Sequence, residues 1–216
     1  MEKGEVYAYL ADVKNANADA LYANFGASME ASRKERIERC TNAREKTTLV
    51  ATGALLQGVL KREGVTADMI DYGEHGKPFI KGREDLFINI SHSGNYVLIA
   101  LSGQEIGVDI QKPVPFKESL VNEISSMDER SKIEKDVVKR LNYVWAIKES
   151  YTKLTGEGIG KKLSEVTYDE YEDHLDIFDN GEKSAYAVMA YSDDIYSAII
   201  TAREPFAVKN LARMSL

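Results

Sequence analysis

Short segments dominated by bulky hydrophobic and β-branched residues predict the strands of this chain. Glycine, proline, asparagine and serine separate several of them, as is usual at turns. The predicted strands are residues 6–11, 87–91, 96–101, 106–111, 185–190 and 195–201. Because short turns join the three segments between residues 87 and 111, we expect these to form an antiparallel meander.

Two longer stretches, residues 29–61 and 128–154, have apolar residues at helical spacing and contain no proline. Glycines follow both stretches and end the helical pattern. The order of strand, helix, strands, helix and strands predicts an α+β fold. We expect two similar α+β halves, residues 1–111 and 112–216, with the boundary where prolines stop the strand at 106–111.

The charge and cysteine content limit the classes of function. The 216 residues carry a formal net charge of −7, which argues against general nucleic-acid affinity. Cys40 is the single cysteine, so a cysteine-based metal site is excluded and a reducing compartment fits. The first residues, Met1-Glu2-Lys3-Gly4-Glu5, lack the basic start and apolar run of a signal peptide, and no apolar run approaches the ~20 residues of a membrane span. We therefore expect a cytoplasmic protein.

The predicted strand at 106–111 carries a carboxylate. Side chains alternate along a strand, so Gly107, Asp109 and Gln111 share one face and three apolar residues share the other. Aspartate is depleted in strands, which means that Asp109 needs a reason to be there. Spacing alone favours a cap of the turn before Pro113, and the alternative is a ligand-binding carboxylate.

The second helical stretch also ends in a carboxylate. Large apolar residues recur every four positions before Glu149, so this residue lies at the end of a row that faces the core. A buried carboxylate is costly unless it is paired or bound to a metal ion. An ordinary ion pair with Lys153 at i, i+4 and a metal ligand are equally good interpretations of the spacing.

Two loops could hold an anion. Lys77 lies between Gly76 and Pro78, and Ser91 and His92 begin a turn rich in hydroxyl and backbone N–H groups. The first helical stretch is basic, since it carries Arg33, Lys34, Arg36, Arg39 and Arg44. Taken one at a time, each of these features is typical of solvated loops and helix faces.

Together these segments resemble the 4′-phosphopantetheinyl transferases, and the length resembles the Sfp-type members. The resemblance covers about residues 33–160. It rests on Gly76-Lys77-Pro78, Asn89-Ile90-Ser91-His92-Ser93, Gly107-Val108-Asp109-Ile110, and Trp145-Ala146-Ile147-Lys148-Glu149-Ser150 with Lys153, in this order.

The resemblance implies transfer of the phosphopantetheine arm from coenzyme A to a serine of an acyl or peptidyl carrier protein. Such carriers serve fatty-acid, polyketide or nonribosomal peptide synthesis. It also implies a pseudo-twofold monomer with coenzyme A and Mg²⁺ in the cleft between its halves. By motif match, Asp109 and Glu149 would bind the metal ion. The residues that would contact coenzyme A are Lys77, Ser91, His92, Lys148 and Lys153, with Arg36 and Arg44 as looser matches.

One position departs from the family pattern. Many members carry a second acid two residues after the strand aspartate, as a third metal ligand, and this chain has Gln111 there. Its carbonyl oxygen could still bind the metal ion, but the site has one negative charge fewer. For the base that removes the serine proton, Glu149 or a water beside the metal ion comes first, and Glu129 is the other residue in a matching region.

Two other classes of function remain as alternatives. A binding module for coenzyme A or a carrier protein could keep the fold without catalysis, although it would not need Asp109, Lys148, Glu149 and Lys153 together. A metal-dependent nucleotide hydrolase is less well supported, because the chain lacks a phosphate-binding loop motif.

Overall fold

The computed structural model describes residues 1–73, 75–113, 115–193 and 195–215. It confirms the α+β class. The α-helices are α1 (Ala18–Phe25), α2 (Ala31–Arg39), α3 (Ala43–Leu60), α4 (Glu118–Ile124), α5 (Met127–Lys135) and α6 (Val137–Thr155). The strands are β1 (Glu5–Asp12), β2 (Ile70–Tyr72), β3 (Pro78–Ile80), β4 (Phe87–Ser93), β5 (Tyr96–Ser102), β6 (Ile106–Gln111), β7 (Val166–Glu170), β8 (Leu175–Asp179), β9 (Glu182–Ser192), β10 (Ser197–Ala202) and β11 (Ala207–Ser215).

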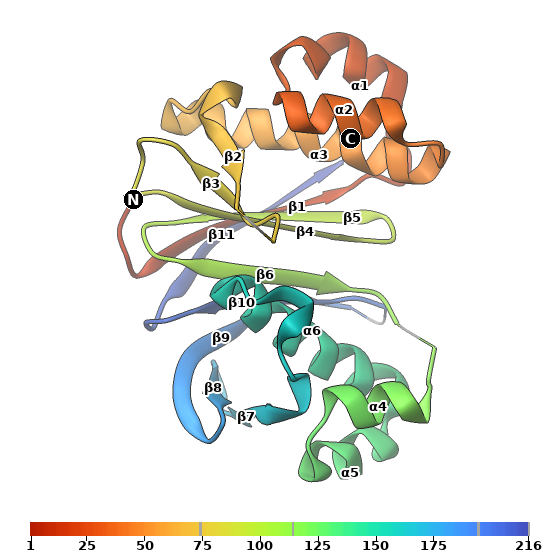
Figure 1. Ribbon diagram of the computed structural model, residues 1–216, viewed down its shortest axis with the longest axis vertical. Helices are drawn as coiled ribbons and strands as arrows, with labels where there is room; N and C mark the ends of the chain where they lie inside the picture. Colours follow the sequence, from red (N-terminus) through yellow and green to blue (C-terminus); the bar gives the residue numbers. More distant parts are fainter. Residues whose placement is uncertain (74, 114, 194, 216) are drawn as a thin grey trace.

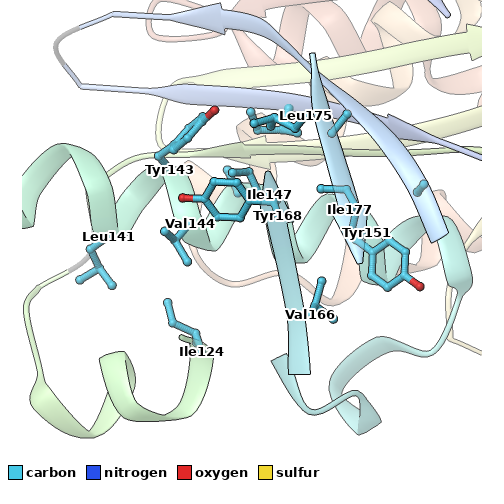
Figure 2. Close-up of a cluster of buried hydrophobic side chains, with 14 of the residues drawn as sticks. Ile124, Leu141, Tyr143, Val144, Ile147, Tyr151, Val166, Tyr168, Leu175 and Ile177 are labelled. Atoms are coloured by element: carbon cyan, nitrogen blue, oxygen red, sulfur yellow. The ribbon is translucent and has the colours of Figure 1, made fainter. Parts of the chain in front are cut away.

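Two sheets lie between two layers of helices (Figure 1). The first sheet has the order β11-β1-β5-β4 and the second has the order β6-β10-β9-β8-β7. Helices α1, α2 and α3 lie beyond the first sheet, and α4, α5 and α6 lie beyond the second. Figure 2 shows the core that α6 forms with β7 and β8, where Ile147 and Ile177 are fully buried.

A separate apolar core joins the two sheets. Val108 and Ile110 of β6 contribute to it, as do Leu10 of β1 and Ile200 of β10. All four side chains are at most 2% exposed. The prediction that one face of residues 106–111 packs inward is therefore confirmed, and that face contacts the other sheet.

The predicted helix at 29–61 is in fact two helices. The chain is extended at Cys40, and the Asn42 side chain accepts a hydrogen bond from the backbone N–H of Glu45 at 3.0 Å, which starts α3. The predicted helix at 128–154 is likewise divided at Asp136, which caps the start of α6. In both places a short polar side chain competes for the backbone donors and starts a new helix.

The expected meander is only partly correct. Strands β4 and β5 pair in antiparallel fashion, but β6 leaves their sheet and pairs with β10. Strand β11 returns to the first sheet and runs parallel to β1. Strand β6 thus joins the sheet formed by later strands, and β11 joins the sheet formed by earlier ones.

The hydropathy of the helices bears on membrane insertion. Within the described ranges, none of the helices combines the length and the apolar character needed to traverse a bilayer.

Candidate active site

Strand β6 and helix α6 touch backbone to backbone at Gly107. A Cβ atom at this position would lie 1.9 Å from the carbonyl oxygen of Ser150 and 2.4 Å from the backbone nitrogen of Leu154. Only glycine permits so close an approach. The contact brings Asp109, two residues further along β6, to the last turns of α6.

Asp109, Lys153 and Ser91 form a closed triangle of hydrogen bonds. The ammonium group of Lys153 donates to Oδ1 of Asp109 at 2.6 Å and to Oγ of Ser91 at 2.9 Å. The Ser91 hydroxyl donates to the same Oδ1 at 2.8 Å. Three elements, β4, β6 and α6, therefore meet at one carboxylate oxygen.

The Ser91 hydroxyl is fully occupied by this arrangement. It also accepts from the backbone N–H of Ile110 at 3.3 Å, so its one proton and both lone pairs are used. The side chain is buried, with 5% exposure. The hydroxyl thus holds Asp109, and contact of Ser91 with coenzyme A stays a prediction.

The second oxygen of Asp109 has no such support. Among the residues that the structure describes, none donates a hydrogen bond to Oδ2, and this atom is buried. Burial raises the pKa of Asp109, while the charge and hydrogen bond of Lys153 lower it. A buried, unpaired carboxylate oxygen is costly, and a cation would satisfy it.

Glu149 is the second carboxylate here. Burial and the charge of Asp109 raise the pKa of Glu149, while Lys153 lowers it, so the two acids repel each other. Across the described part of the chain, no three His, Cys, Asp or Glu side chains are grouped to hold a metal ion on their own. Two carboxylates fit Mg²⁺, which is usually held by one or two carboxylates, phosphate oxygens and water.

A cavity of about 230 Å³ adjoins this cluster. Lys77 and Pro78 of the first half line it, as do Glu149 and Lys153 of α6. The ammonium group of Lys77 donates to the carbonyl oxygen of Leu154 at 2.8 Å, at the C-terminal end of α6. Lys77 thus reaches from the first half of the chain to the helix that carries Glu149 and Lys153.

His92, Arg36 and Arg44 lie around the other end of β4 and are exposed. Partial desolvation of the His92 ring by its neighbours, although the residue is exposed overall, and the positive charges of Lys153 and Arg36 lower the pKa of His92. The guanidinium of Arg44 donates to Oδ1 of Asn95 at 2.5 Å. The positive charges of Arg36 and Arg44 beside this imidazole could hold an anion.

Lys148 lies outside this cluster. Its side chain is fully buried, and its ammonium group contacts Oε2 of Glu129 at 2.6 Å and the carbonyl oxygen of Leu163 at 3.1 Å. Burial lowers the pKa of Lys148, and the charge of Glu129 raises it. Lys148 thus contacts Glu129 of α5 and does not line the cavity, and its contact with phosphate groups stays a prediction. Glu129, the other candidate base, is only 4% exposed and is engaged with Lys148.

Gln111 continues the face of β6 that carries Asp109. Its amide nitrogen donates to the carbonyl oxygen of Lys112 at 3.1 Å, and its own carbonyl oxygen in the backbone accepts from Asn142 at 2.9 Å. The Gln111 side chain is thus held by a contact to the adjacent residue, Lys112.

The sequence interpretation missed Asn89. This residue lines the cavity, and its Oδ1 accepts from the backbone N–H of Val108 at 3.1 Å. The signal was present in the polar residues at 89 and 91 of the predicted strand 87–91, since this alternation places both on one face.

Known proteins that are similar in sequence to this chain point to the same family. Residues 105–188 match the model of the 4′-phosphopantetheinyl transferase superfamily. The chain is 27% identical to a 4′-phosphopantetheinyl transferase of Bacillus subtilis over 83% of this chain and 84% of that protein. It is 35% identical to the 4′-phosphopantetheinyl transferase Sfp of Bacillus subtilis strain 168, over 46% of each chain. It is 29% identical to 4′-phosphopantetheinyl transferase pptA of Paxillus involutus, over 74% of this chain and 71% of that protein. The match to Sfp thus spans less than half of either protein. The chain is thus similar over most of its length to a 4′-phosphopantetheinyl transferase, and its residues 105–188 match the model of that superfamily.

Proposed function

We propose that this chain transfers the 4′-phosphopantetheine arm of coenzyme A to a serine hydroxyl of an apo acyl or peptidyl carrier protein and releases adenosine 3′,5′-bisphosphate. The observation that carries the proposal is the unpartnered Oδ2 of Asp109, held beside Lys153 and Glu149 at a cavity that Lys77 also lines. Two carboxylates and two lysines suit a diphosphate together with Mg²⁺.

The bond changes balance within these two substrates. The serine oxygen forms a bond to the phosphorus that bears pantetheine, and the bond from this phosphorus to the bridging oxygen breaks. The bridging oxygen leaves on the adenosine bisphosphate, and the serine loses its proton. Asp109, Glu149 and Gln111 would hold Mg²⁺, which would neutralise charge on the phosphate oxygens.

The side chains of this chain supply the remaining chemistry. Lys77 and Lys153 place positive charge at the cavity, where negative charge moves onto the leaving group. Glu149 is our candidate for accepting the serine proton, since burial and Asp109 raise the pKa of Glu149 toward the range useful in a base. His92, Arg36 and Arg44 would hold the nucleotide end of coenzyme A.

We also propose that residues 1–111 and 112–216 are pseudo-twofold halves of a monomer. In support, α3 and α6 are long helices of similar length, and each packs on an antiparallel part of a sheet. Both sides of the cavity come from one chain, so a second copy is not needed to complete it.

The test is incubation with coenzyme A, Mg²⁺ and several apo carrier proteins, followed by mass spectrometry of the carriers. We expect the phosphopantetheine mass increment, which should disappear when EDTA is added or when the carrier serine is replaced by alanine. Absence of the increment on every carrier, combined with measurable coenzyme A binding, would instead support the binding-module alternative.

A further inference from the structure

Side chains of β4, and not its backbone, bind the neighbouring strand β6. The backbone N–H groups of Val108, Ile110 and Lys112 donate to side-chain oxygens of β4 at 3.1, 3.3 and 3.2 Å. The acceptors, in the same order, are Asn89 Oδ1, Ser91 Oγ and Ser93 Oγ. Residue numbers increase together on both strands, so the two strands run parallel. We call this row of contacts the β4–β6 seam.

The seam fixes the orientation of the Asn89 amide group. A backbone N–H such as that of Val108 can be satisfied only by the oxygen of the amide, so Oδ1 faces β6 and Nδ2 faces away from it. The Ser91 hydroxyl already donates its proton to Asp109, and Ser93 does not line the cavity. Asn89 therefore presents an NH₂ group whose direction is set by the protein.

This NH₂ group belongs to a residue that lines the cavity. Asn89 is only 2% exposed, yet it borders the cavity together with Lys77, Glu149 and Lys153. No acceptor for Nδ2 is found among residues 1–73, 75–113, 115–193 and 195–215, whereas Oδ1 has its partner in Val108. Nδ2 is therefore the polar atom of this side chain that remains for a partner in the cavity.

The charge of the cavity identifies the kind of partner. Lys77 and Lys153 attract anionic oxygens, and a neutral amide adds a directional donor without further charge. We propose that Asn89 is a substrate-binding residue whose Nδ2 donates to a diphosphate oxygen of coenzyme A. The inference rests on the proposed function for the identity of the ligand, but Asn89 should bind inorganic diphosphate in the same way.

Calorimetry with coenzyme A and Mg²⁺ tests the proposal through binding alone. Asn89→Asp keeps an oxygen for the Val108 N–H and removes the donor, whereas Asn89→Ala removes both. Ser93→Ala is the matched control, because it removes an equivalent seam contact, to Lys112, from a residue that does not line the cavity. We expect both Asn89 variants to bind coenzyme A at least about tenfold more weakly, a difference of 1.4 kcal/mol, and Ser93→Ala to bind like the wild type.

Nuclear magnetic resonance adds a direct readout. The side-chain NH₂ signals of Asn89, identified by their loss in Asn89→Ala, should shift when coenzyme A or inorganic diphosphate is added. Unchanged NH₂ signals, wild-type affinity in Asn89→Ala, or an equal loss in Ser93→Ala would each overturn the proposal. These outcomes are independent of transfer to a carrier, so a failure of the transferase proposal would leave the binding result interpretable.

Discussion

The ammonium group of Lys153 lies 2.6 Å from Oδ1 of Asp109, although 44 residues separate them in the sequence. Lys153 is also four residues after Glu149, where an ion pair along the helix was one of the two interpretations. Within the described residues, the salt bridge forms with Asp109 and not with Glu149. Lys153 therefore fastens α6 to β6 and leaves the Glu149 carboxylate free for a ligand.

Replacing Lys153 with methionine should disable the site and weaken the fold. Asp109 would keep its charge in a buried position without a cation, so we expect the free energy of unfolding to fall by about 1.5–3 kcal/mol. Transfer to a carrier should fall at least about 100-fold, as when a charge stabiliser of the reaction is removed. Urea denaturation and initial rates measure the two effects. Lys162→Met is the control, since Lys162 forms an exposed pair with Glu165, and comparable losses in this control would refute the specific role of Lys153.

Glu149→Gln should separate activity from stability. The substitution keeps the shape of the side chain and removes its repulsion of Asp109, so the free energy of unfolding should stay equal or rise slightly. Transfer should be abolished, because a metal ligand and the candidate base are lost together. Thermal unfolding and the carrier mass assay give the two measurements. Full activity in this variant would remove Glu149 from the site.

Local patterns in the sequence predicted the residues that the site needs but not every direction in which they point. Alternation placed Asp109 opposite the apolar face of β6, and that face is buried as expected. Helical spacing placed Glu149 near the end of a core-facing row, and it borders the cavity. Both predictions depend on the spacing of side chains within a single strand or helix, and this spacing can be counted in the sequence.

What could not be predicted depends on contacts between elements. Lys148 stands next to Glu149 in the sequence, but a step of one residue turns the side chain by about 100° around a helix of 3.6 residues per turn. It therefore points toward Glu129. The use of Ser91 by three partners and the departure of β6 from the meander likewise follow from sheet packing, for which the sequence has no short-range signal.

The substitution Gln111→Glu tests the departure from the family pattern. A third acid would raise the negative charge beside Asp109, which should strengthen Mg²⁺ binding. We expect the Mg²⁺ concentration for half-maximal transfer to fall several-fold, as measured by rates across a Mg²⁺ titration at saturating coenzyme A. Asn122→Asp, at an exposed position of α4 outside the cavity, controls for net charge because it adds the same negative charge. An unchanged Mg²⁺ titration in Gln111→Glu would place residue 111 outside the metal shell.

The buried pair of Lys148 and Glu129 should be structural. Lys148→Met leaves the Glu129 carboxylate buried without its partner, at a cost of about 3–5 kcal/mol in the free energy of unfolding. Adding Glu129→Gln to this variant should recover part of the loss, because the uncompensated charge disappears. The Michaelis constant for coenzyme A of the folded fraction should change less than twofold. A large increase in that constant would instead show that Lys148 reaches the ligand.

The close approach of β6 and α6 should tolerate no side chain at Gly107. In Gly107→Ala the new methyl group would overlap the carbonyl oxygen of Ser150 and the backbone of Leu154, and neither strand nor helix backbone can yield cheaply. We expect a loss of about 3 kcal/mol or more in the free energy of unfolding, together with a loss of transfer, because Asp109 and Lys153 move apart. Gly58→Ala in α3 is the matched control: nothing lies within 4 Å of a Cβ atom there, and a helical Gly→Ala change should stabilise by up to about 1 kcal/mol. Urea denaturation of both variants measures the contrast. Equal free energies of unfolding in the two variants would mean that the contact between β6 and α6 does not depend on glycine at position 107. Another feature would then have to explain how Asp109 and Lys153 are brought together.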